Sequence, residues 1–107
     1  MKTIHDVHDV IEGCIDAVGI SGVSTKPIDG GVQYTIGNRA SRVVQSGHWF
    51  YVDNVLFPDA EDGSEVTTNP NARRFVDAEN AATTVMVFLF EGYVSVLVKG
   101  EMDWLES

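Results

Sequence analysis

The chain has 107 residues, of which 44% are hydrophobic and 21% charged, and its 16 acidic and 7 basic side chains give a net charge of -9. This length and apolar fraction predict a single compact domain over residues 1–107, with a core that needs neither a disulfide nor a structural metal. The charge disfavours direct binding to nucleic acid or to an anionic membrane, because both require Lys and Arg to displace counterions. Cys14 is the only cysteine, which excludes an internal disulfide and Cys-based zinc clusters.

The first predicted element is an amphipathic helix from Ile4 to Val18. Its apolar residues recur on one arc at 100° per residue, and its acidic residues fall on the opposite arc. Thr3 is suited to the N-cap, with Asp6 as its capping-box partner three residues later. Gly19 can adopt positive φ just after the helix, so that Ile20 packs back on Ile15.

An antiparallel meander is predicted after a connector at 21–31. Alternating apolar residues indicate strands, and Gly37-Asn38 and Ser46-Gly47 mark the turns between them. Connections this short cannot form parallel crossovers. The predicted strands are 32–36, 39–45 and 48–53, the last continuing over 55–57 past a bulge at 53–54.

The second half of the chain predicts a short helix and two further strands. Asn69-Pro70 is typical of a helix start, which places a helix over 70–80. The apolar segment 83–90 suits a central strand, and 93–99 returns antiparallel to it after a turn at Glu91-Gly92. The C-terminal apolar residues then fold back onto the sheet edge. The predicted fold is α+β and two-layered, with an antiparallel sheet of about five strands in the order α-β-β-β-α-β-β.

No motif predicts a metal, a cofactor or a catalytic residue. His5 and Asp9, like His8 and Glu12, are four residues apart on the first helix, a spacing more typical of solvated charge pairs than of a metal site. The acidic loop 59–65 lacks the ligand spacing of a helix–loop–helix calcium site. The chain is therefore predicted not to be an enzyme.

One alternative is retained, a small ligand-binding or enzymatic domain in which His48 acts in a pocket between helix and sheet. A nucleophile for His48 as general base could only be the Cys14 thiol. However, Cys14 lies on the apolar arc of the first helix, where a free cysteine behaves as a small buried hydrophobe.

The preferred prediction is a small acidic module that binds another protein and acts by occupying its surface. Residues 1–53 carry 4 basic and 6 acidic side chains, whereas 54–107 carry 3 basic and 10 acidic ones. Acidic patches steer a protein onto basic targets, and exposed aromatic side chains dominate binding hot spots. Inhibitors, immunity proteins and phage anti-defence proteins that mimic nucleic-acid charge are of this general type. The predicted partner-binding residues are Trp49, Tyr51, Asp59, Glu61, Asp62, Glu65, Glu101 and Asp103.

Two further hypotheses concern assembly and environment. The element order is similar to that of class I secretion chaperones, which implies a homodimeric adaptor, although the closing helix of that family has no predicted counterpart. The acidity also agrees with adaptation to high salt. The lone thiol, the acidic N-terminus and the absence of an Asn-x-Ser/Thr sequon favour the cytoplasm. The longest uninterrupted apolar run, Val85 to Phe90, is too short to span a bilayer.

Overall fold

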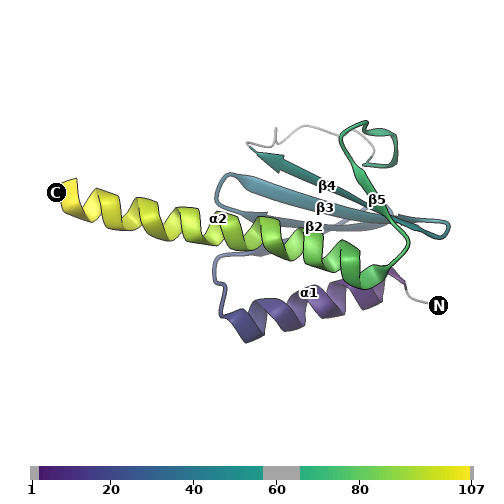
Figure 1. Cartoon of the computed structure of the whole chain (residues 1–107), viewed down its shortest axis with the longest axis horizontal. Coiled ribbons are helices and arrows are strands. Elements are labelled where there is room, and N and C mark those ends of the chain that lie inside the picture. Colours follow the sequence, from purple (N-terminus) through teal and green to yellow (C-terminus); the bar gives the residue numbers. More distant parts are fainter. Residues whose placement is uncertain (1–2, 57–65, 107) are drawn as a thin grey trace.

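The computed structural model describes residues 3–56 and 66–106, with side chains at 3–56, 66–67 and 69–99. In this part of the chain, five strands form one antiparallel sheet in sequence order, and two helices accompany it (Figure 1). The α+β class and the five-stranded antiparallel sheet are therefore confirmed. The elements are α1 (Ile4–Val18), β1 (Ser24–Ile28), β2 (Gly31–Ile36), β3 (Arg39–Ser46), β4 (Trp49–Leu56), the 3-10 turn η1 (Val66–Thr68), β5 (Arg73–Phe75) and α2 (Ala78–Glu106).

Helix α1 has the predicted bounds and the predicted caps. The Thr3 backbone N–H donates to a carboxylate oxygen of Asp6 at 2.6 Å, which is the reciprocal half of a capping box. Gly19 closes the helix at φ 80°, and the Ile20 N–H donates to the Ile15 carbonyl at 3.1 Å. Local sequence chemistry therefore determines both ends of this helix.

The three strands predicted for the meander are confirmed as β2, β3 and β4, joined by turns in which Gly37 and Gly47 have positive φ. The predicted bulge at 53–54 is wrong. Strand β4 continues to Leu56, and Asp53 and Asn54 pair in unbroken register with Arg42 and Ser41.

The remaining two strands come from segments where none was predicted. Residues 24–28, within the predicted connector, form the edge strand β1, and residues 73–75, within the predicted helix 70–80, form the opposite edge strand β5. Both strands are short, and most of their side chains are exposed. Neither therefore shows the alternation of apolar and polar residues that marks a half-buried strand.

The predicted strands 83–90 and 93–99 are wrong, because both lie within the single 29-residue helix α2. The predicted turn at Glu91-Gly92 lies in mid-helix, and the backbone of 102–105 continues the helix away from the sheet instead of folding back (Figure 1). Asp77 caps α2 through a 2.8 Å hydrogen bond from the Glu79 N–H. Gly92 is where α2 approaches β2 and β3, since a Cβ at that position would lie 2.9 Å from Ile36 Cγ2 and from Arg39 Cδ.

Both helices cover the same face of the sheet, which we call the inner face. The core combines the buried side of α1, the first half of α2 and alternate residues of β2, β3 and β4. The opposite, outer face is partly covered by η1, whose Val66 is buried. The inner-face core consists of Val7, Ile11, Ile20, Tyr34, Ile36, Val43, Phe50, Val52, Ala78, Ala81, Ala82, Val85 and Leu89.

Two glycines provide a test of this packing with opposite expected signs. A Cβ at Gly31 would lie 1.8 Å from the Val43 carbonyl oxygen, so we expect Gly31→Ala to lower the free energy of unfolding by about 1–3 kcal/mol. Gly13 lies within α1 with nothing within 4 Å of the added Cβ, so Gly13→Ala should raise that free energy by about 0.5–1 kcal/mol. Urea unfolding followed by circular dichroism measures both. Equal effects of the two substitutions would contradict the close β2–β3 approach.

Candidate functional site

An exposed row of apolar side chains follows the outward side of α2. We call these five residues, Val87, Phe90, Val94, Leu97 and Val98, the α2 outer row; their exposed fractions are 53, 47, 40, 51 and 50%. Residues 87, 90, 94 and 97 are spaced by three, four and three, so they lie along one line of a helix. Glu91 is the single charged residue between 80 and 98. Its carboxylate pairs with the Arg39 guanidinium at 3.2 Å.

The α2 outer row lies on the side of the helix opposite the sheet. The buried positions of α2, among them Ala81, Val85, Leu89 and Gly92, are offset by half a turn from Val87, Phe90 and Val94. Contact with the sheet continues as far as Val96, whose Cγ2 lies 3.0 Å from the position of a Cβ at Gly37 in the β2–β3 turn, and the C-terminal part of the helix projects from the body (Figure 1). A helix that is apolar on both sides is covered on both sides in most proteins. This row is therefore the strongest candidate for a binding surface in the described part of the chain.

The sequence contains the apolar spacing of this row, but it lies within the two segments predicted as strands, 83–90 and 93–99. The three–four–three spacing of 87, 90, 94 and 97 is helical, whereas the other apolar residues between them hide the period. By length and composition, residues Ala78–Lys99 of α2 are also apolar enough to cross a membrane, with mean hydropathy 1.8, and 28% of this window is buried. The core helix of a soluble protein can meet the same criterion, and the expectation that the chain does not bind a membrane stays a prediction.

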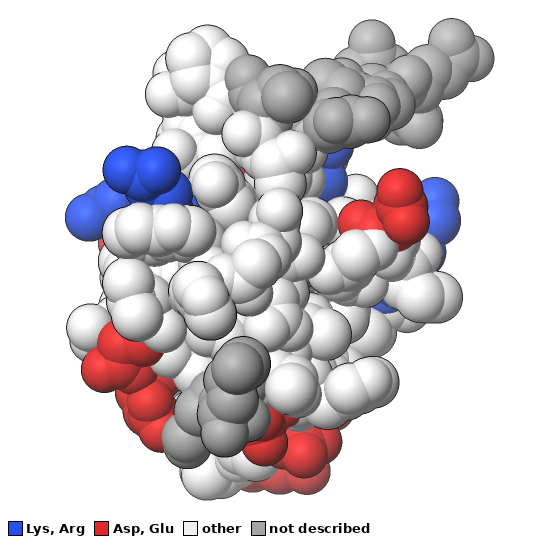
Figure 2. Space-filling model, turned by 90° about the vertical axis from the view of Figure 1, so that its right-hand side faces the viewer, with Lys and Arg blue, Asp and Glu red and all other residues white. Residues whose placement is uncertain are grey.

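The predicted acidic surface is only partly within the described structure. Asp59, Glu61, Asp62 and Glu65 lie outside the described residues. Glu101 and Asp103 belong to the last turns of α2 by backbone, and their side chains lie outside the description. On the face shown in Figure 2, acidic side chains gather along the lower edge, where α1 lies, and the centre of the face is largely uncharged.

The predicted aromatic pair lies on the outer face of the sheet, on neighbouring odd positions of β4. Trp49 is 36% exposed, and the Arg74 guanidinium stacks over its ring at 4.3 Å. Tyr51 is half-buried and pairs in register with Arg74 of β5. The structure therefore brings Trp49 and Tyr51 together with an arginine that the sequence did not place beside them.

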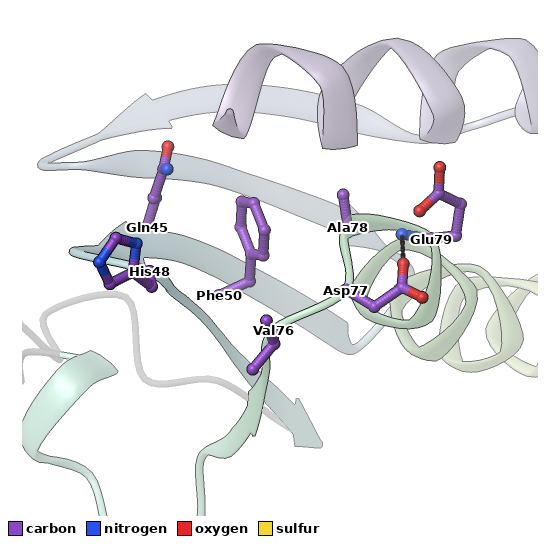
Figure 3. A pocket seen from close by; sticks show the side chains of 7 residues that line it. All are labelled: Gln45, His48, Phe50, Val76, Asp77, Ala78 and Glu79. Carbon is purple, nitrogen blue, oxygen red and sulfur yellow. Dashed lines mark hydrogen bonds between the residues drawn. The ribbon is translucent and has the colours of Figure 1, made fainter. Parts of the chain in front are cut away.

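His48 is exposed in the β3–β4 turn and borders a shallow pocket of about 340 Å³ next to the start of α2. Figure 3 shows His48 and Gln45 on one side, Asp77 and Glu79 on the other, and Phe50 between them. Two of these polar side chains accept hydrogen bonds from backbone N–H groups. The Gln45 side-chain oxygen accepts from the Ile4 N–H at 2.9 Å, and Asp77 caps α2. The lining contains no Ser, Thr, Cys or Lys, so its titratable groups are the His48 imidazole and the Asp77 and Glu79 carboxylates.

The other paired candidates separate in the structure. Ile4 contacts Gln45 near the β3–β4 turn, so Cys14 lies about 15 Å further along α1 and does not meet His48. His8 Nε2 lies 3.7 Å from Glu12 Oε1, as the i, i+4 spacing predicts. Among the described residues, no group of three His, Cys, Asp or Glu side chains has a metal-binding arrangement.

A buried charge pair on the outer face was not foreseen. Arg42 of β3 forms an ion pair with Asp53 of β4, and both side chains are at least nine-tenths buried. Asp53 also accepts a 3.0 Å hydrogen bond from the Asn69 side chain, which follows η1. A sheet face outside a two-layer core is normally solvated, so burial of this pair depends on the segment around η1. Its place beneath that segment indicates a structural role.

Tyr34 is fully buried on the inner face, and its hydroxyl lies 2.5 Å from His8 Nδ1. Burial raises the pKa of the Tyr34 phenol above its ordinary 10.0, and the carboxylates of Glu12 and Asp9 raise it further. The phenol therefore stays protonated in the folded chain at pH values where the unfolded chain ionises.

The difference between the folded and unfolded pKa of Tyr34 predicts that the chain loses stability in alkaline solution. The contribution of Tyr34 is fully present below pH 10, the unfolded pKa, and is lost as pH rises toward the higher folded pKa. Above pH 10 the free energy of unfolding should fall by up to about 1.4 kcal/mol per pH unit on account of this residue. Urea unfolding of wild type and Tyr34→Phe between pH 8 and pH 11 measures the effect. The variant should start about 1 kcal/mol less stable and show a shallower alkaline decline; parallel declines would contradict the assignment.

Comparisons of the chain with protein-family models, with curated proteins and with solved structures found no match. The function is therefore inferred from the geometry described above.

Proposed function

We propose that this protein is a small acidic binding module that acts on another protein by occupying its surface, and that it binds through the α2 outer row. The observation that carries this proposal is the exposure of Phe90, Leu97 and their neighbours on a helix side whose charge, Glu91, is already paired. Exposed apolar patches of several hundred Å² are rare on monomeric proteins and mark interaction surfaces. A cytoplasmic location belongs to the same proposal.

The proposal moves the principal contact from the acidic loop to α2. Acidic side chains elsewhere would steer the approach to a partner with a basic surface, whereas desolvation of the apolar row would supply most of the affinity. Trp49 and Tyr51, beside Arg74 on the outer face, form a separate surface with its own aromatic anchor.

Site-specific photo-crosslinking in the native host tests the proposal. A benzophenone amino acid at Val94, on the row, should give protein adducts under ultraviolet light, whereas the same group at Lys26, exposed on β1, should not. The protein identified from the adduct is then purified and titrated against the wild type and Phe90→Ser. We expect at least about 30-fold weaker binding of the variant, because a buried aromatic anchor contributes about 2 kcal/mol or more. Lipid adducts alone, or equal labelling at Lys26, would overturn the proposal.

A further inference from the structure

We infer that the protein covering the α2 outer row is a second copy of this chain, and that two α2 helices pack antiparallel about a two-fold axis near Gly92. This inference rests on the proposed function for the surface, the α2 outer row, and names a second copy of the chain as its occupant in place of a partner with a basic surface. The α2 outer row forms the contact between the two copies, and the symmetric spacing of its residues about position 92 sets the register.

The row is complementary to itself when the helix direction is reversed. About a centre at residue 92, Val87 lies opposite Leu97 of the second copy, and Phe90 lies opposite Val94. These pairs are the layers that an antiparallel helix pair with three–four spacing forms. The same register places Thr83 opposite Glu101, so a polar residue ends the row on each side. Most oligomers use such isologous contacts, in which one patch meets its own copy.

The shape of the molecule leaves room for this packing. Helix α2 contacts the sheet as far as Val96, whose Cγ2 lies 3.0 Å from the position of a Cβ at Gly37, and its C-terminal part projects from the body (Figure 1). In an antiparallel pair centred at residue 92, each projecting part lies along the sheet-bound part of the other copy, and the two bodies stay on opposite sides of the helix pair.

A parallel pair is less favourable because of charge. The last turns of α2 contain Glu101, Asp103 and Glu106, and parallel packing would bring two sets of these acidic residues together. Antiparallel packing keeps the two sets at opposite ends of the helix pair, where each set lies near only two acidic residues of the other copy, Asp77 and Glu79. Glu91 adds little repulsion, because Arg39 already pairs with it.

A bilayer fits the row less well than a second copy. Helices that lie on membranes carry Lys and Arg on their polar side, whereas the charged residues of α2 are five acids and Lys99. Spanning a bilayer would also remove Val85 and Leu89 from the core, where both are fully buried.

The first test is the mass of the purified chain by light scattering with size-exclusion chromatography. We expect twice 11.7 kDa for the wild type. Val94→Asp places a charge in the centre of the apolar contact and should weaken dimerisation at least about 100-fold. Ser95→Asp makes the same charge change one residue away, on an exposed side position, and should remain dimeric. Circular dichroism of both variants verifies folding. A monomeric wild type, or equal masses of the two variants, would overturn the inference.

Disulfide trapping tests the orientation, in a Cys14→Ser background. Phe90→Cys and Val94→Cys chains, mixed and oxidised, should form the mixed disulfide, because these positions face each other in the antiparallel register. Each chain alone should crosslink poorly. Rapid crosslinking of each variant with itself would show a parallel pair and overturn this register. If the purified chain is monomeric but Val94 still captures a different protein in cells, the second-copy inference fails and the proposed function stands. Capture of lipid alone overturns both.

Discussion

Replacement of Arg42 by methionine is expected to lower the free energy of unfolding by about 3–5 kcal/mol, which is the cost of breaking a buried ion pair. The remaining Asp53 carboxylate is 2% exposed, with a 3.0 Å hydrogen bond from Asn69. A carboxylate held in that environment without the guanidinium loses most of the interactions that offset its desolvation. Urea unfolding at pH 7 measures the difference.

Two controls separate burial from charge. Glu91→Gln removes the exposed pair with Arg39 and should cost at most about 1 kcal/mol, since exposed ion pairs contribute little. The double variant Arg42→Met/Asp53→Leu replaces the pair by apolar groups and should recover most of the stability lost by Arg42→Met alone. A loss below about 1 kcal/mol for Arg42→Met would show that the outer face is open to water at this point.

The second large effect is expected from Leu89→Ala, which should destabilise the fold by about 2–5 kcal/mol. Leu89 is fully buried against the inner face of the sheet, so its truncation leaves a cavity. Leu97 is the matched control, because it is the same residue type on the same helix and is 51% exposed. At concentrations where the chain is monomeric, Leu97→Ala should change stability by less than about 0.5 kcal/mol.

The same pair of variants links stability to assembly. Leu97→Ala should weaken the dimer, so its effect on unfolding should grow with protein concentration, whereas the effect of Leu89→Ala on each monomer should not depend on the partner in this way. Equal losses at low concentration would contradict the assignment of one side of α2 to the core and the other to the outside.

The candidate site was less predictable than the fold class, for a physical reason. Phe90, Val94 and Leu97 have the spacing of a helical row, but Val85, Met86 and Leu89 just before them are also apolar. An apolar segment without a clear period fits a buried strand and a buried helix equally well. Interpreted as a strand, residues 93–99 place Val94, Val96 and Val98 in the core, whereas the structure leaves all three exposed.

The aromatic prediction was closer to the structure, because it depended on strand alternation alone. Trp49 and Tyr51 share the outer face of β4, as alternate residues of a strand must. Their arginine neighbour was not predictable, since Arg74 belongs to β5, a three-residue edge strand in a segment that had the start signal of a helix.

Local chemistry by itself determined α1 with both caps, the two glycine turns and the antiparallel meander of β2, β3 and β4. In these segments, the caps, turns and alternating residues that determine the conformation lie within a few residues of one another, so the conformation depends little on tertiary contacts. The conformation of 83–99 was decided only by tertiary structure. The inner face of the sheet, with Val43, Phe50 and Val52, needs an apolar cover, and a long helix supplies Val85 and Leu89 to it while retaining all its backbone hydrogen bonds. That choice also exposes the α2 outer row, because a helix that is apolar all round can give only one of its sides to one sheet.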